Sequence, residues 1–419
     1  MNRIEEMIRE LCPEGIVYEK LGAICFYPKE RIAYSKLSVE NYVSTENLLK
    51  DKKGKINAAS IPNEGMAIEF CVGDILIGNI RPYLKKIWLA DCCGGTNGDV
   101  LLMRIRNQDL IISKFLYYIL SSDAFFNFDN QYAKGAKMPR GDKNKVMEFM
   151  IPVPPLAIQN EIVNILDKFT ELEAELEAEL EARRKQYEYY RNKLLNFSKF
   201  GGGYSEDVKW CKLSDIGTFY GGLTGKSKRD FIAGNAKFIT YMNVYSNIAI
   251  DVNMNDMVQI AEGEKHNKVE YGDVVFTGSS ETPDDCGMSS VMTTRPDGDL
   301  YLNSFCFGFR MNDRALLLPD FMKFLFRSEE IRKQIIKTAS GVTRFNVSKK
   351  RFGEVVIPIP LMKEQQRIVA ILDKFETLVN DISEGLPAEI AARRQQYEYY
   401  RDKLLTFKRK EDAKIQPCC

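Results

Sequence analysis

Histidine is nearly absent from the sequence: His266 is the only one in 419 residues, and no cysteine stands near it at ligand spacing. A zinc site and a catalytic triad built on histidine are therefore not expected. The ten cysteines include no Cys-x-x-Cys pair, and no signal peptide precedes them, which indicates reduced thiols. No apolar run approaches the length of a membrane span, so we expect a cytoplasmic protein without a membrane partner.

An excess of charge is also missing. Lysine and arginine total 59 against 58 aspartate and glutamate residues, which gives a net charge of +1. Both halves of the chain are close to balance, so neither is a general binder of polyanions. If nucleic acid is the ligand, its affinity must come from local basic clusters and from partner proteins.

Recognisable catalytic motifs are missing as well. The sequence contains no Gly-x-Ser-x-Gly, no Asp-Pro-Pro-Tyr or Asn-Pro-Pro-Tyr of the amino-methyltransferases, and no carboxylate pair with a metal or general-acid signature. Residues 221–227, GGLTGKS, are similar to a phosphate loop, but Tyr220 stands where that motif needs its first glycine. We therefore expect no catalytic residue and no metal site in this chain.

What the sequence does contain is a long repeat. Residues 183–197, RRKQYEYYRNKLLNF, and residues 393–407, RRQQYEYYRDKLLTF, differ only at the third, tenth and fourteenth places. Upstream, residues 151–169 match residues 357–375 at an offset of 206, and beyond them the offset becomes 210. The second copy therefore has four extra residues, in the stretch that contains Gly385 and Pro387.

Both copies have the apolar spacing of a coiled coil, with steps of three and four residues averaging about 3.5. Prolines at 152, 154 and 155 suit a helix start, and one helix is expected from about 156 to 198. Its length of about 65 Å is too great for one small domain to cover, so we expect the two copies to pack antiparallel. The predicted seam consists of Leu166, Phe169, Leu172, Leu176, Leu180, Tyr187, Tyr190 and Leu194 in the first copy, and of Leu372, Phe375, Ile382, Tyr397, Tyr400 and Leu404 in the second.

Two stretches disturb this seam. Residues 171–181, ELEAELEAELE, form a solvated acidic face of tetrads, and each tetrad drifts by about 40° from a straight stripe. In the second copy, proline removes a helical hydrogen bond and clashes with the preceding turn. We therefore expect a kink or a looped-out turn at Gly385 and Pro387.

Each repeated helix follows a globular segment. In the first segment a short helix precedes strand-like runs at 17–24, 41–45, 67–70, 74–80, 86–90 and 99–105, all bounded by glycine, asparagine or aspartate. A helix is predicted over 113–128, then a polar loop over 134–145 and a strand over 146–151. The sequence thus predicts an α+β protein in which two sheet-containing segments are joined by two long helices, and the segments lie at opposite ends of a rod.

The second segment repeats this plan. Gly272 and Asp273 match Gly73 and Asp74, and from residue 303 onward the offset of 206 holds, so that Arg310 falls on Arg104. The middle of the segment and its loops differ. Two domains with one scaffold and different loops can present two different surfaces.

Basic and polar side chains cluster on loops of both segments. Lysine, serine and threonine suit phosphate contacts, while arginine pairs with guanine and asparagine with adenine, so Arg344 and Asn346 are the candidates for base contacts. The alternative is that these are ordinary solvated loops. The candidate DNA-binding residues are Arg81, Lys85, Lys86, Lys134, Lys137, Arg140 and Lys143 in the first segment, and Lys226, Lys228, Arg229, Thr343, Arg344, Asn346 and Lys349 in the second.

The repeated IPVPPLAIQNEIVNILDKF and IPIPLMKEQQRIVAILDKF, the ELEA tetrads, the YEYYR(N/D)KLL blocks and the LCPEGIVYEKLG start together resemble the specificity subunits of type I restriction-modification enzymes, along essentially the full chain. The resemblance implies two target-recognition domains that bind the halves of an interrupted, asymmetric DNA site. It implies no activity and no cofactor in this subunit, two modification subunits that use S-adenosylmethionine, and restriction subunits that hydrolyse ATP with Mg²⁺.

On this resemblance the chain divides into an N-terminal helix (1–14), a first target-recognition domain (15–154), a central conserved helix (155–200), a second target-recognition domain (201–360), a C-terminal conserved helix (361–410) and a flexible tail (411–419). The helices would serve as ruler and docking surface, with a pseudo-twofold internal repeat. A coiled-coil adaptor that does not contact DNA explains the helices but not the paired segments. A standalone methyltransferase or nuclease would need motifs that are absent.

Overall fold

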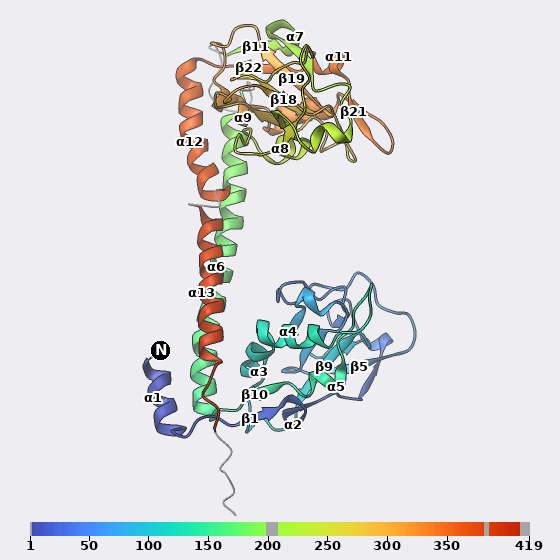
Figure 1. Cartoon of the computed structure of the whole chain (residues 1–419), viewed down its shortest axis with the longest axis vertical. Helices are drawn as coiled ribbons and strands as arrows, with labels where there is room; N and C mark the ends of the chain where they lie inside the picture. Colours follow the sequence, from blue (N-terminus) through green and yellow to red (C-terminus); the bar gives the residue numbers. More distant parts are fainter. Residues whose placement is uncertain (1, 198–207, 381–384, 411–419) are drawn as a thin grey trace, which may run out of the picture. The chain divides into compact units, whose positions relative to one another are not determined.

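The computed structural model describes residues 2–197, 208–380 and 385–410. The chain forms two units: unit 1 comprises Met1–Leu176 with Ile390–Cys419, and unit 2 comprises Glu177–Glu389. Helix α6 (Leu156–Leu194) begins in unit 1 and ends in unit 2, whereas α13 (Leu386–Leu404) begins in unit 2 and ends in unit 1 (Figure 1). Unit 1 therefore contains two distant parts of the sequence, whereas unit 2 is one continuous stretch.

Unit 1 is a set of small sheets covered by short helices. Its elements before α6 are α1 (Asn2–Leu11), β1 (Tyr18–Lys20), α2 (Leu21–Ile24), β2 (Cys25–Phe26), β3 (Arg31–Ala33), η1 (Tyr34–Lys36), β4 (Tyr42–Val43), β5 (Met66–Phe70), β6 (Ile75–Gly78), η2 (Pro82–Leu84), β7 (Ile87–Leu89), β8 (Gly94–Thr96), β9 (Val100–Ile105), α3 (Ser113–Leu120), α4 (Asp123–Gln131), α5 (Lys143–Val146) and β10 (Met150–Pro152). The strands form sheets in the orders β2-β9-β6-β7, β3-β5-β8-β4 and β1-β10.

Unit 2 is also built from short strands and short helices that precede a long helix. They are β11 (Lys209–Lys212), α7 (Leu213–Ile216), β12 (Gly217–Gly221), η3 (Lys228–Phe231), β13 (Ala236–Ile239), α8 (Tyr241–Ser246), β14 (Met257–Val258), β15 (Val274–Thr277), β16 (Ser279–Ser280), β17 (Ser289–Val291), β18 (Leu300–Leu302), β19 (Cys306–Met311), α9 (Pro319–Leu325), α10 (Glu329–Ile336), β20 (Ala339–Ser340), β21 (Phe345–Val347), α11 (Lys349–Phe352), β22 (Val356–Ile359) and α12 (Met362–Asn380). Its sheets are β12-β19-β15-β17, β14-β13-β18, β16-β21-β20 and β11-β22.

The central sheet is buried on both faces in each unit. In β6, Ile75 and Ile77 join the cluster under the helices, while Leu76 joins a second cluster on the opposite face. In β15, Val274 and Val275 divide between two clusters in the same way. Successive strand side chains point to opposite faces, so a strand buried on both sides is apolar throughout.

The internal repeat is visible in one buried ion pair per unit. Arg104 donates to Asp74 at 2.8 Å, and Arg310 donates to Asp273 at 2.7 Å. Each aspartate follows a glycine whose φ is +86°, a turn conformation that glycine adopts without strain. The predicted repeat of the globular segments is therefore confirmed.

The two repeat helices pack against each other within each unit. In unit 1 the ring of Phe169 lies 5.6 Å from Tyr400, and Glu173 pairs with Arg394, so the partner's number falls as the number in α6 rises. This order is that of antiparallel helices. In unit 2 the ring of Tyr190 lies 5.5 Å from Phe375, where the end of α6 runs beside α12 (Figure 1).

Burial along the predicted seam is uneven. Leu172 is 48% exposed, because the four-residue steps rotate it away from the partner helix. Its assignment to the buried seam was wrong. The remaining seam positions are buried or partly buried, except Tyr190, which is 36% exposed but stacks on Phe375, and Ile382, which lies outside the described residues.

Three predicted elements differ from the structure. The helix expected over 113–128 is two helices, because Ser122 caps α4 by accepting from the backbone N–H of Phe125. The stretch 17–24 contains one helical turn, α2, after strand β1. The strand expected from residue 146 begins only at Met150, since Asp142 caps the short helix α5.

The expected interruption of the second long helix is confirmed at Gly385, which forms a bend and is not helical. Helix α12 ends at Asn380 and α13 begins at Leu386. Pro387 lies in the first turn of α13, where a missing N–H leaves no hydrogen bond unmade. Residues 381–384 lie outside the described residues.

Candidate nucleic-acid interface

The two basic clusters of unit 1 are brought together by one hairpin. We define the 134–140 hairpin by the bridge between Lys134 and Arg140 that closes it. The backbone N–H of Arg81 donates to Pro139 O at 2.7 Å, and Gly141 N–H donates to Asn79 O at 3.2 Å. The strand-like segment at 79–81 therefore holds the base of this hairpin.

Beside this hairpin lies a hollow of about 530 Å³, the unit 1 hollow. Its wall includes Arg81 and Lys86 from the first predicted cluster and Met138 from the second. It also includes two carboxylates, Glu46 and Asp99. The hollow is thus polar and of mixed charge.

Several predicted cations of unit 1 are already paired. Lys85 lies 2.8 Å from Asp123, Lys134 lies 2.8 Å from Asp142, and Arg140 lies 3.1 Å from Asp99. An ion-paired cation must give up its partner before it binds phosphate, so its gain on binding is reduced.

Among the residues that the structure describes, the other unit 1 candidates have no carboxylate partner. Lys86 donates to Thr45 O, and burial lowers the pKa of its ammonium. Lys143 lies 3.5 Å from Gly98 O. Within the described residues no ion pair involves Arg81 or Lys137, so these two are the cations most available to a ligand in unit 1.

Unit 2 builds the same hairpin at the equivalent place. We define the 340–346 hairpin by the pairing of Ser340 with Asn346 between β20 and β21. Ser279 and Ser280 pair with Asn346 and Phe345, as residues 80 and 81 contact the first hairpin. Lys134 and Arg140 correspond to Ser340 and Asn346 at the offset of 206, so the scaffold is shared while the side chains differ.

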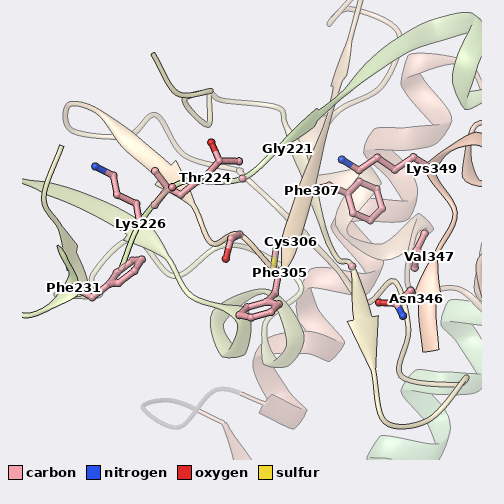
Figure 2. A pocket seen from close by; sticks show the side chains of 15 residues that line it. Gly221, Thr224, Lys226, Phe231, Phe305, Cys306, Phe307, Asn346, Val347 and Lys349 are labelled. Atoms are coloured by element: carbon pink, nitrogen blue, oxygen red, sulfur yellow. The ribbon is translucent and has the colours of Figure 1, made fainter. Parts of the chain in front are cut away.

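A hollow of about 560 Å³, the unit 2 hollow, lies next to this hairpin (Figure 2). The loop with Gly221 and Thr224 forms one side, Asn346 and Lys349 form the other, and Phe305 lies between them. Its lining residues include no aspartate or glutamate, unlike those of the unit 1 hollow. A polyanion would meet less repulsion here.

Arg344 is held at the rim of the unit 2 hollow. Its guanidinium lies 5.6 Å from the ring centre of Phe305 and donates to Ser279 Oγ at 3.3 Å. Within the described residues Arg344 forms no ion pair. The side chain of Asn346 forms no hydrogen bond within the same residues. Both predicted base-contacting side chains are exposed, and neither is paired with a carboxylate within the described residues.

The other unit 2 candidates divide into engaged and available groups. Lys226 pairs with Glu264 and its side chain is only 6% exposed, so it supports the glycine-rich loop. The ammonium of Lys349 lies 5.6 Å over the Phe307 ring. Lys228, Arg229 and Thr343 are exposed.

The sequence did not single out Phe305, the aromatic side chain beneath Arg344. The offset of 206 aligns it with Asp99, which pairs with Arg140 in unit 1. This alignment could have identified Phe305 from the sequence. The aligned position contacts a hairpin arginine in both units: Asp99 forms an ion pair with Arg140, and the ring face of Phe305 lies under Arg344.

Over residues 2–197, 208–380 and 385–410, no three His, Cys, Asp or Glu side chains gather as metal ligands. None of the helices described has both the length and the apolar character needed to cross a membrane.

The sequence also matches a known protein family. Residues 25–182 and 205–392 match the family model for the type I restriction modification DNA specificity domain. A type I restriction enzyme specificity subunit of Escherichia coli is 34% identical over 316 residues, which cover 71% of this chain and 72% of that protein. A putative specificity subunit of Haemophilus influenzae is also 34% identical, over 72% of this chain and 74% of that protein.

The fold has a solved counterpart. A chain from a structure of a type I R-M system, concerned with complex assembly and conformational transition, superposes with a TM-score of 0.61 at 20% identity, and the match covers 93% of this chain and 97% of that chain. The specificity subunits of these systems are a non-catalytic class that recognises DNA. This chain belongs to that family, the type I restriction-modification DNA specificity subunits.

Proposed function

We propose that each unit recognises one half of a bipartite, asymmetric DNA site, with residues 15–154 and 201–360 as the two target-recognition domains. The observation that supports this proposal is the shared hairpin. Its exposed bend is Ala-Lys-Met at 136–138 in unit 1 and Val-Thr-Arg at 342–344 in unit 2. Both hairpins would bind the duplex in the same orientation, because they share one scaffold. Their different tip side chains would then recognise two half-sites of different sequence.

In this proposal the available cations anchor the backbone and the hairpins contact bases. Arg81 and Lys137 in unit 1, and Lys228, Arg229 and Lys349 in unit 2, contact phosphates. Arg344 and Asn346 contact base edges in the second half-site, because both are exposed and neither is ion-paired among the residues that the structure describes. The chain is close to neutral, so most of the affinity depends on assembly with partner subunits.

The helical regions 155–200 and 361–410 serve as docking surface for two modification subunits, and restriction subunits join that complex. S-adenosylmethionine, ATP and Mg²⁺ act in those partners. The apolar seam residues hold the helices together, and the side chains on the outer faces, such as Tyr189 and Tyr399, which are 59% and 62% exposed, are available to the modification subunits.

The test is an exchange of residues 205–356 for the corresponding domain of another specificity subunit, followed by methylome sequencing of cells that also express the modification subunits. Only one half of the methylated site should change. A change in both halves, or in neither, would contradict the proposal, and gel shifts with and without the modification subunits separate it from a coiled-coil adaptor.

The same helices are proposed to set the spacer between the half-sites. Deleting one ELEA tetrad shortens a helix by about 6 Å, which corresponds to a spacer shorter by one or two base pairs at about 3.4 Å each. Mapping the methylated sites of this variant measures the spacer. An unchanged spacer would remove the ruler function and leave the recognition function intact.

A further inference from the structure

We propose that Val342, at the tip of the 340–346 hairpin, packs against the C5-methyl group of one thymine in the major groove and thereby determines one base pair of the second half-site. This inference rests on the proposed function and adds a specificity-determining residue to it.

Val342 is 92% exposed, although it is an apolar β-branched residue. The bend at 342–344 follows Gly341, whose φ is +152° and at which a Cβ would lie 2.0 Å from Arg344 O. Only glycine fits there, so the loop is tightly turned. Figure 1 shows the loop next to β21 projecting from unit 2.

The base of the hairpin is fixed on both sides. Asn346 pairs with Ser340 and with Ser279, and Val347 N–H donates to Gly278 O at 2.9 Å. The tip is therefore carried by three hydrogen-bonded strands rather than by a free loop. A two-stranded ribbon of this kind fits the width of the major groove.

The surroundings of Val342 suit DNA rather than an apolar protein partner. Arg344 precedes the strand, and Lys349, Lys350 and Arg351 follow it in the helical turn α11, all exposed. No acidic residue occurs between residues 330 and 354. An apolar tip among cations matches a thymine methyl group that stands between two rows of phosphates.

The equivalent hairpin of unit 1 differs at this position. The counterpart of Val342 is Ala136, and the exposed apolar group is Met138, 50% exposed, which falls on Arg344. The apolar and cationic side chains thus occupy different places on the same backbone. A contact through Val342 would therefore be specific to the second half-site.

The experiment uses the chain assembled with its modification subunits and a duplex that contains the site defined by methylome sequencing. Each thymine of the second half-site is replaced in turn by uracil, which removes only the C5-methyl group. One replacement should weaken binding about fourfold, the effect of one buried methyl group. Val342→Ala should weaken binding to the thymine duplex by a similar factor, and uracil at that place should then have no further effect.

Val72→Ala is the matched control, since Val72 is an equally apolar residue of unit 1 that is 62% exposed. This variant should retain the full sensitivity to uracil. Additive losses from Val342→Ala and uracil, indifference of the unaltered complex to every uracil, or a second half-site without thymine would each overturn the role of Val342. Failure of the unaltered complex to bind its site would overturn the proposed function itself.

Discussion

Gln159 in unit 1 and Gln365 in unit 2 make the same three hydrogen bonds at the start of their helices. The Nε2 group of Gln159 donates to Leu110 O at 2.9 Å and to Pro154 O at 2.7 Å, and its Oε1 accepts from Ile112 N–H at 2.9 Å. The side chain is fully buried. It therefore joins the first turn of α6 to the segment before α3.

The second glutamine repeats this arrangement. Gln365 donates to Leu316 O and Pro360 O, both at 2.9 Å, and accepts from Leu318 N–H at 2.8 Å. Every partner lies 206 residues after its counterpart. The same buried amide thus fixes the angle between each globular part and its long helix.

Gln365→Leu should destabilise unit 2 by about 2–4 kcal/mol, because three buried backbone groups lose their partners. Hydrogen exchange measured at the Leu318 amide should rise accordingly. Gln366→Leu changes the same residue type at the next, exposed position and should have little effect. Equal effects of the two substitutions would contradict the role of the buried amide.

The carboxylate of Asp129 makes stability depend on pH. Asp129 is 1% exposed, and neither of its oxygens has a hydrogen-bond partner within the described residues. Burial raises its pKa from 3.8 to about 6. A Cβ at Gly141 would lie 2.3 Å from Asp129 Oδ1 and 2.8 Å from Asn79 Oδ1, so the acid lies at the base of the 134–140 hairpin.

A raised carboxyl pKa favours the protonated form in the folded state. Its contribution to stability is present below pH 4 and is lost as the pH rises through 6. Asp129→Asn should therefore raise the free energy of unfolding at pH 8 by up to about 3 kcal/mol and have little effect at pH 4. The new amide can also donate to Asn79 Oδ1, which has no partner within the described residues.

Asp123→Asn in the same helix is the control of opposite sign. Burial opposes ionisation of Asp123, but hydrogen bonds from Lys85 and Lys52 outweigh it and lower its pKa to about 2. This substitution should destabilise the protein at pH 8 and lose its effect as the pH falls through that value. Denaturation curves at pH 8 and pH 4 measure the Asp129→Asn effect, and a further curve at about pH 2 measures the loss of the Asp123→Asn effect. An Asp129→Asn effect independent of pH would show that the acid is not protonated in the folded protein.

Asn346→Ala should relax specificity at one base pair of the second half-site by about 1–3 kcal/mol. Lys349→Ala should instead weaken binding to all sequences and reduce the salt slope of the assembled complex by about one. Binding to a panel of single-base variants at several salt concentrations measures both effects. Lys333, which pairs with Glu329 on α10, provides a lysine control with no expected effect. If Asn346→Ala weakened binding equally to all sequences, Asn346 would contact phosphates and not a base.

Cys71 and Cys93 should form a disulfide under a mild thiol oxidant such as diamide. They stand one step beyond the Phe70 and Gly94 pair that ends the β5–β8 ladder, and both are exposed. Directly opposed residues in such a ladder have a Cα separation of about 4.5–5.5 Å, within the range that a disulfide spans. Diamide takes up two electrons and the two thiol protons and becomes the hydrazine, while one S–S bond replaces two S–H bonds.

The pKa of Cys71 is raised, mainly by burial, so cross-linking should be faster at pH 9 than at pH 7. Peptide mass spectrometry identifies the bond. The buried thiols of Cys25 and Cys306, whose pKa values burial raises to about 12, should remain reduced. A cross-link through Cys92 instead would contradict the proposed register.

The sequence alone determined the two-part plan of this protein, because near-identical helical repeats and a constant offset are visible without any contact information. It also identified the basic clusters and the interruption around Pro387, which depend on local chemistry. Helix ends set by single capping residues, such as Ser122, were missed. A short polar side chain inside an apolar run can either cap a new helix or lie within a continuous one, and the sequence does not distinguish the two.

Only the tertiary structure decided which candidates are available to a ligand. Lys85, Lys134 and Lys226 look like Lys137 in the sequence, but each is paired with a carboxylate that lies 8 or more residues away. Arg344 lies over Phe305, and Ser279 holds the 340–346 hairpin, by pairings that join distant segments. Ion pairs and strand registers of this kind depend on how the sheets fold, so no local pattern of residues specifies them.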